Sequence, residues 1–240
     1  MLPPVHSEKF HKLQRGRYLG DIVYGANDGI ITTFAVVAGA AGANFSVGTV
    51  IVLGLANLIA DGISMGLSNF LALRSRRDFD RDERKKEEEE IGQFPEVERK
   101  EVQNILERWG VPETSMEAVL AGVTKDKKRW VDLMMIEELG IIEDQSGPPI
   151  AHGAMTSAAF ILAGAMPLLP YVLHIVSSAE FTVSIIATAV SLFVVGALRS
   201  SVTKRWWVRS GGEMLGVGAL AALAAYVVGF AVKRFFGISL

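Results

Sequence analysis

The chain has 240 residues, half of them hydrophobic, with a mean hydropathy of +0.33 and a formal net charge of −2. It contains no cysteine, which excludes disulfides and thiolate metal ligands. It also lacks a G-x-G-x-x-G nucleotide-binding motif, and we expect no nucleic-acid partner.

Charged residues are distributed very unevenly along the sequence. Between Ile22 and Leu73 only Asp28 and Asp61 are charged, and from Gly153 to Leu198 only Glu180 is. Met214 to Val232 carries no charge at all. A helix needs about 20 mostly apolar residues to cross a bilayer, so these stretches predict transmembrane helices.

We predict an all-α membrane protein with five transmembrane helices and a helical cytosolic metal-binding insert between spans two and three. Lysine and arginine in the N-terminal arm, at the start of the insert and after span four indicate that all three lie in the cytosol. The predicted spans are 22–43, 49–73, 153–175, 181–198 and 213–233. The predicted domains are a cytosolic arm (1–21), spans one and two (22–73), the insert (74–146), and spans three to five (147–240).

Two carboxylates are predicted at membrane depth. Asp28 lies in span one, and Asn57, Asp61 and Met65 form a polar stripe at four-residue spacing in span two. A carboxylate in the bilayer costs at least about 2.5 kcal/mol, so it persists where it pairs, faces a cavity or binds an ion. No lysine or arginine lies within these spans, which favours a cation pathway over a structural ion pair. The Met65 thioether would favour softer transition metals, although methionine in a helix is usually packing.

The insert holds 20 of the 26 acidic residues and predicts helices over 74–91, 96–109 and 116–139, the last as one helix or two. Two Glu-x-x-Glu pairs occur here, Glu87 with Glu90 and Glu98 with Glu101. Residues three positions apart project to one side of a helix, so each pair can converge on a cation. The alternative is a solvated acidic face. Metal affinity should fall as pH drops through about 4–5, the range of ordinary glutamates. The candidate ligands are Glu87, Glu90, Glu98, Glu101, Met134, Met135 and Glu138.

Five short motifs occur in the order that is typical of one family. They are Asp28-Gly29, Ile63-Ser64-Met65-Gly66, Glu89-Glu90-Ile91 with Pro95-Glu96, Asp132-Leu133-Met134-Met135 with Glu138-Leu139-Gly140, and Pro167-Leu168-Leu169-Pro170-Tyr171. With these motifs the chain resembles the vacuolar iron transporter family over nearly its whole length.

The resemblance implies a homodimeric exporter of Fe²⁺, with Mn²⁺ or Co²⁺ as alternatives, driven by inward proton flow. It implies that the insert ligands are Glu87, Glu90, Glu98, Glu101, Met134 and Glu138, with Met135 adjacent, and that Asp28 and Met65 serve translocation. The membrane would be vacuolar in a eukaryote and cytoplasmic in a prokaryote. No enzyme activity and no prosthetic group are expected, and the partners are divalent metal ions, protons, lipid and a second copy.

The chain departs from the family pattern in span two, with Asn57 in place of a glutamate and Asp61 in place of a glycine. This keeps one carboxylate on the same face, one turn further along. Glu213 matches a family acidic position, and it could equally pair with Arg209. The rival hypotheses are a membrane-bound diiron or ferritin-like enzyme and a metal-sensing membrane protein. Against the enzyme, diiron sites of this kind use two Glu-x-x-His motifs, and the sequence contains one, Glu8 to His11.

Overall fold

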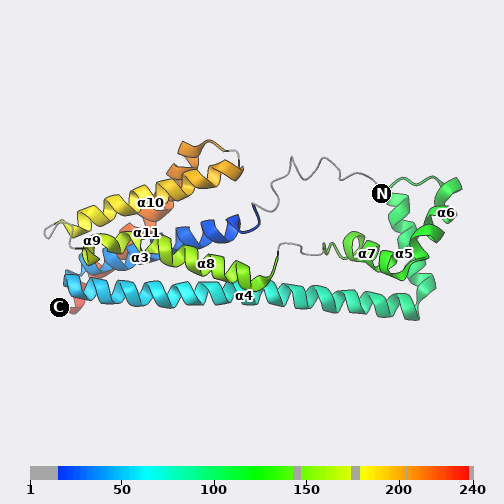
Figure 1. The fold of residues 1–240 in the computed structure, drawn as a ribbon, viewed down its shortest axis with the longest axis horizontal. Helices are drawn as coiled ribbons and strands as arrows, with labels where there is room; N and C mark the ends of the chain where they lie inside the picture. The colour runs from blue at the N-terminus through cyan, green and yellow to red at the C-terminus, as the bar shows by residue number, and fades with distance from the viewer. Residues whose placement is uncertain (1–15, 143–146, 174–178, 204, 238–240) are drawn as a thin grey trace. The chain divides into compact units, whose positions relative to one another are not determined.

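A computed structural model describes residues 16–142, 147–173, 179–203 and 205–237, and all the regular structure in these ranges is helical (Figure 1). The elements are α3 (Leu19–Gly42), α4 (Val47–Gln93), α5 (Pro95–Arg108), α6 (Glu113–Thr124), α7 (Lys127–Glu137), α8 (Pro149–Gly164), the 3₁₀ turn η1 (Met166–Leu168), α9 (Leu169–Val172), α10 (Glu180–Thr203) and α11 (Trp207–Phe236).

Five helical segments in the described residues are long and apolar enough to cross a membrane, which confirms the predicted number of spans. They are α3, the first part of α4, α8 with η1 and α9, α10, and α11. The third segment is interrupted after Gly164, because Pro167 and Pro170 each lack an N–H for a helical hydrogen bond. Ser184 of α10 donates a hydrogen bond of 2.7 Å to the Pro167 carbonyl at this break. Residues 174 and 175 of the predicted span lie outside the described residues.

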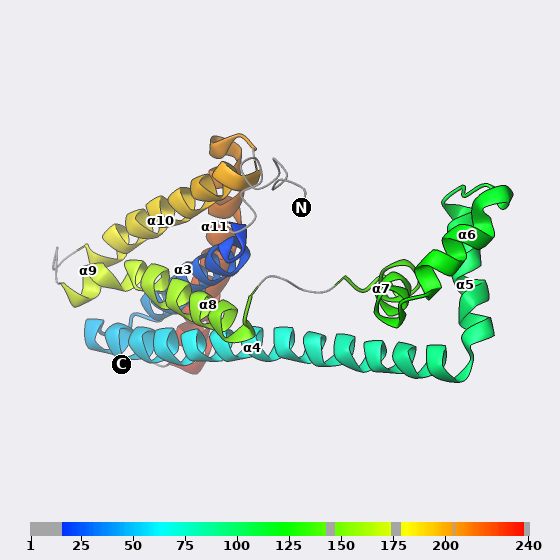
Figure 2. The same ribbon diagram turned by 45° about the vertical axis from the view of Figure 1, so that its right-hand side comes forward.

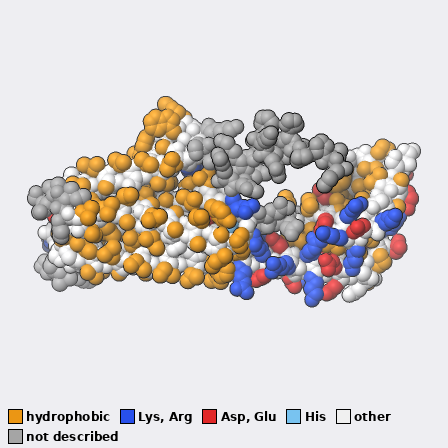
Figure 3. Space-filling model, in the orientation of Figure 1, with side chains coloured by type: hydrophobic (Ala, Val, Ile, Leu, Met, Phe, Trp, Pro, Cys, Tyr) orange, Lys and Arg blue, Asp and Glu red, His pale blue; other side chains and the backbone are white. Residues whose placement is uncertain are grey.

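The chain divides into two compact units. One contains the residues up to Leu71 and those from Gly147 onward, and the other is Ala72–Ser146. Helix α4 contributes to both, and its apolar part gives way to charged residues from Arg74 onward. Figure 3 shows hydrophobic side chains gathered over the first unit and charged side chains over the second.

In the first unit, α3 packs against α8, α10 and α11, as Figure 2 shows. Glycines allow the α3 and α8 backbones to touch. A Cβ on Gly29 would overlap the carbonyl of Phe160, and one on Gly164 would lie 2.7 Å from the carbonyl oxygen of Gly29. Helices in lipid associate through such small residues, because no hydrophobic effect drives them together there.

The second unit has its own apolar core, formed by one face each of α4, α5, α6 and α7. Ile91, Val102, Leu106 and Trp130 belong to this core, and Met134 lies at its centre with no exposed surface. The segment 116–139 forms two helices. Asp126 caps the second of them by accepting hydrogen bonds from the backbone N–H groups of Lys128 and Arg129.

Candidate metal site and membrane carboxylates

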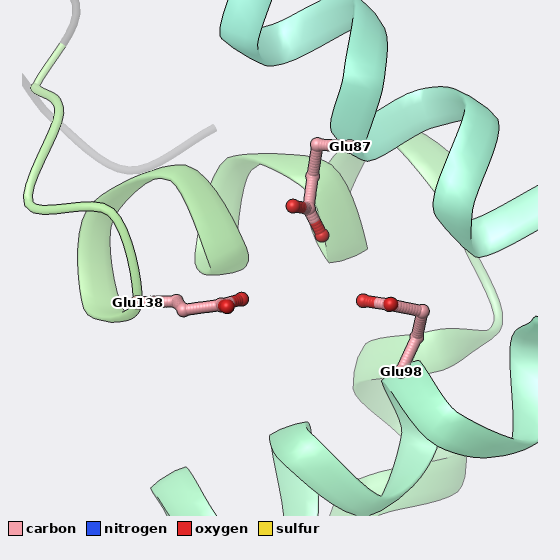
Figure 4. Close-up of side chains that lie close together, drawn as sticks. All are labelled: Glu87, Glu98 and Glu138. Atoms are coloured by element: carbon pink, nitrogen blue, oxygen red, sulfur yellow. The ribbon is translucent and has the colours of Figure 1, made fainter.

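Three glutamates of the second unit point toward one another (Figure 4). Glu87 comes from α4, Glu98 from α5, and Glu138 is the C-terminal capping residue of α7. One carboxylate oxygen from each lies within 4.8 Å of the other two. The three side chains therefore outline a site that a single cation could occupy.

The local sequence explains why these acids converge. Glu87 is one helical turn before the core residue Ile91, and Glu98 is one turn before Val102, so both acids lie on the buried faces of their helices. Between them α4 ends at Gln93 and Pro95 begins α5, so the chain turns sharply and the two faces meet (Figure 2).

The first two carboxylates are almost completely removed from solvent. Glu87 is 2% exposed and Glu98 is 6% exposed, whereas Glu138 is exposed. Oε1 of Glu87 and Oε2 of Glu98 are buried without a hydrogen-bond partner among the described residues. A buried carboxylate oxygen without a partner is costly, and a bound cation or a proton would remove that cost.

The electrostatics of the cluster favour uptake of positive charge. Burial, together with the nearby charges of Glu98, Glu138 and Glu90, raises the pKa of Glu87 to about 8. Burial and neighbouring carboxylates, Glu101 first among them, also raise the pKa of Glu98 and of Glu138. Among the described residues no arginine forms an ion pair with these three glutamates. Arg84 is paired with Asp132 and Glu88, and Arg99 with Glu117. Arg108 lines one depression together with Glu101 and Glu138.

The remaining predicted insert ligands fall into two groups. Glu90 is exposed and Glu101 partly buried, and both lie close enough to influence the pKa values of the cluster. Glu101 also lines a depression of about 630 Å³ beside Glu138. Met134 and Met135 are 0% and 5% exposed and belong to the apolar core. All five predicted glutamates therefore lie in one neighbourhood, and both methionines pack in the apolar core of the same unit.

The indole nitrogen of Trp130 is a further polar atom of this unit, and it was not anticipated from the sequence. Trp130 is 7% exposed, and its indole Nε1 has no hydrogen-bond partner among the described residues. An isolated tryptophan in a helical segment predicts core packing, so no sequence signal could have revealed the unpaired N–H.

The predicted membrane carboxylates are both half-buried and unpaired. Neither Asp28 nor Asp61 forms an ion pair with a described residue, and the two are near enough to interact electrostatically. Asn57 and Met65 are also half-buried, and the Nδ2 of Asn57 lacks a partner among the described residues. Met65 packs against the apolar cluster formed by Phe34, Leu58, Phe160 and their neighbours.

The polar stripe of span two lies next to the seam through which α4 contacts the third span. Gly62 and Gly66 are buried in this seam, against Ile161 and Gly153. Asp61 and Met65 each immediately precede one of these glycines. The stripe is therefore positioned at the edge of a helix-packing interface.

A buried polar network that the sequence did not predict joins three spans. The Asp21 carboxylate contacts His152 Nδ1 at 2.6 Å and accepts a hydrogen bond of 2.7 Å from Asn69 Nδ2. Asn69 also lies 2.7 Å from Thr156 Oγ1, which donates to the His152 carbonyl. Asp21 and His152 are 131 positions apart. No local sequence pattern could pair Asp21 with His152.

Glu213, which the sequence left open between a family role and an ion pair, does contact Arg209. The carboxylate lies 3.5 Å from Arg209 Nε and 3.9 Å from Arg205 Nη1. The ion pair is therefore present, although the groups are well exposed and such pairs contribute little stability.

The five apolar spans indicate an integral membrane protein, and the carboxylate cluster in its polar helical unit could bind a cation. The chain belongs to the VIT family, whose model matches residues 19–230. It is 34% identical to vacuolar iron transporter 1 of Arabidopsis thaliana, over 95% of this chain and 91% of the relative. It is also 31% identical to a vacuolar iron transporter of Toxoplasma gondii, over 98% of this chain and 80% of the relative.

A third relative is a vacuolar iron transporter of Plasmodium berghei, 33% identical over 95% of this chain and 86% of the relative. These findings confirm the family that the sequence motifs indicated. They also make the chain a transport protein rather than an enzyme, so the diiron enzyme hypothesis is set aside.

Proposed function

We propose that this protein exports Fe²⁺ from the cytosol across its membrane in exchange for protons, with Mn²⁺ or Co²⁺ as alternative substrates. Membership of the VIT family supports transport of metal ions. The observation that supports a divalent cation most directly is the cluster of Glu87, Glu98 and Glu138, which includes two buried oxygens without partners. Several carboxylates that form no ion pair with a described arginine suit a cation of charge two.

In this proposal residues 74–146 form a cytosolic domain that captures the metal ion before transport. Glu87, Glu98 and Glu138 would supply the first ligands. Glu90 and Glu101 would approach from the more exposed side of the cluster. Carboxylates alone do not discriminate strongly among Fe²⁺, Mn²⁺ and Co²⁺, so the thioethers of Met134 and Met135 would have to turn toward the metal to favour the softer ions.

The proposed path through the membrane uses Asp28 and Asp61, with Asn57 and Met65 beside them. These two carboxylates form no ion pair with a described residue, and their mutual repulsion can be relieved either by one divalent cation or by protons. A site that holds one or the other makes the two compete, which is what exchange of metal for protons requires. Asp28 would be the coupling residue, because its carboxylate could bind either the cation or a proton.

We further propose that the N-terminal arm (1–21) and the insert face the cytosol, and that spans one and two (22–73) and the segment 147–240 form the transport unit of a homodimer. The basic residues at Arg74, Arg76 and Arg77 support this orientation. Since the named relatives are vacuolar transporters, the corresponding membrane would be vacuolar in a eukaryotic cell and the cytoplasmic membrane in a prokaryotic one.

The test is metal uptake by proteoliposomes that contain the full chain, with and without a pH gradient. We expect Fe²⁺ uptake that accelerates when the lumen is acidic, accompanied by proton release. Glu87→Gln should weaken capture at low metal concentration, whereas Glu89→Gln, at an exposed site on the same helix, should not. Uptake at the same rate with and without the pH gradient would reject proton coupling. Equal uptake by the Glu87→Gln and Glu89→Gln variants at low metal concentration would reject the metal site in the insert.

A further inference from the structure

A groove on the first unit lies far along the sequence from the carboxylate cluster and plays no part in the proposed transport. It has a volume of about 530 Å³, within the range of ligand-binding sites. Val23 and Tyr24 of α3 line one wall, and Met214 and Val217 of α11 line the other. Arg199 of α10 contributes a charged group. The groove is therefore mainly apolar, with charge supplied by the helix ends.

Two arginines lie beside the charged end of the groove, each in contact with Glu213. Glu213 lines it and contacts both Arg205 and Arg209, whose side chains are 61% and 75% exposed. These two arginines and Glu213 together carry a formal charge of +1. The rim therefore has a charge that complements an anion.

Two adjacent tryptophans place the same turn at a membrane surface. Trp206 directly precedes α11 and is 71% exposed, and Trp207 begins α11 and is 53% exposed. Tryptophan is enriched where the headgroups of a bilayer meet its hydrocarbon. Val217, three helical turns further into the span, is 58% exposed on the groove wall and would face hydrocarbon.

We propose that this groove binds an anionic phospholipid. The phosphate would lie against Arg205 and Arg209, and an acyl chain would follow the apolar walls formed by Val23, Met214 and Val217. Two features support a lipid over a soluble anion. The basic rim lies beside exposed tryptophans, and the groove continues from that rim along two transmembrane helices.

The test is native mass spectrometry of the full chain, released from vesicles that contain equal amounts of phosphatidylglycerol and phosphatidylcholine. We expect retention of phosphatidylglycerol in preference to phosphatidylcholine. Each arginine near an anionic surface contributes about fivefold in affinity, so Arg205→Gln with Arg209→Gln should weaken retention about five- to thirtyfold. Equal retention of the two lipids by the unmodified protein would overturn the proposal.

Glu213→Gln is the matched control, because it removes the same ion pairs but keeps both arginines. Lipid recognition predicts that this variant retains phosphatidylglycerol at least as well as the unmodified protein. If it loses as much lipid as the arginine variant, the arginines only hold the turn in place and the proposal fails. Displacement of the lipid by millimolar glycerol phosphate would likewise overturn it in favour of a soluble phosphate.

Val217→Trp tests the apolar part of the groove. A bulky exposed ring there should reduce lipid retention and leave the mass of the protein assembly unchanged. If instead the variant changes the oligomeric state without changing lipid retention, a second copy of the chain covers the groove and the lipid proposal is wrong.

Discussion

Replacing Glu87 by glutamine should stabilise the metal-free insert while weakening its affinity for metal. The carboxyl group is 2% exposed, and burial with three neighbouring acids raises its pKa to about 8 from an ordinary 4.5. Glutamine has nearly the same shape and carries no charge. The substitution therefore removes the electrostatic cost of the cluster and, with it, an anionic ligand.

The sign and size of the effect follow from proton linkage. Between pH 4.5 and pH 8 the unfolded chain has released a proton that folded Glu87 retains, so the free energy of unfolding decreases as pH rises through this range. From pH 4.5 to pH 7 the loss amounts to about 3 kcal/mol. Glu87→Gln should recover up to about that amount at pH 7 and almost nothing at pH 4.

Urea unfolding in detergent can measure this, followed by tryptophan fluorescence. The chain has four tryptophans, and with Trp206 and Trp207 changed to phenylalanine only Trp109 and Trp130 of the insert remain. Glu89→Gln is the control and should change stability by less than about 0.5 kcal/mol at either pH. Adding Mn²⁺ or Co²⁺ at pH 7 should stabilise the parent strongly and Glu87→Gln much less.

Two results would refute this reasoning. A Glu87→Gln variant that is equally stable to its parent at pH 7 would mean that the carboxyl group is not held in a costly environment. A stability gain of the same size at pH 4 and pH 7 would mean that packing, and not charge, is responsible. The same raised pKa changes the expected pH dependence of metal binding. Affinity should begin to fall below about pH 8, above the range of 4–5 expected for ordinary glutamates.

Further substitutions test the path and the packing. Asp28→Asn should leave a folded protein whose metal transport in proteoliposomes is near background, and parental flux would reject a coupling role. Met65→Leu and Met134→Leu should lower Fe²⁺ or Co²⁺ affinity in competition assays while leaving weak Mg²⁺ binding unchanged, and an altered melting temperature with the parental metal ranking would indicate packing alone. Gly29→Ala should destabilise the spans by about 1–3 kcal/mol because its methyl group would overlap the α8 backbone, whereas Gly216→Ala, with no atom nearby, should be neutral or mildly stabilising in thermal unfolding.

The sequence by itself determined the five spans and the family. Spans can be predicted because a bilayer imposes one requirement, length with little charge, that is local in sequence. The helices of the insert were equally accessible, since Pro95 and Gly110 mark ends that follow from backbone geometry. The break within the third span was missed, although Pro167 and Pro170 signalled it, because hydropathy alone does not register a missing hydrogen bond.

Only the tertiary structure showed which acidic side chains of the insert are buried and which are exposed to solvent. A run of four glutamates from Glu87 to Glu90 looks uniform in sequence, but Glu87 alone of the four is buried, because it shares the helix face of Ile91. Its meeting with Glu98 and Glu138, and the pairing of Asp21 with His152, join residues far apart in the chain. Periodicity fixes the face of a helix on which a side chain lies. The packing of separate helices decides what that face meets, and therefore whether a carboxylate is solvated, paired or left to a cation.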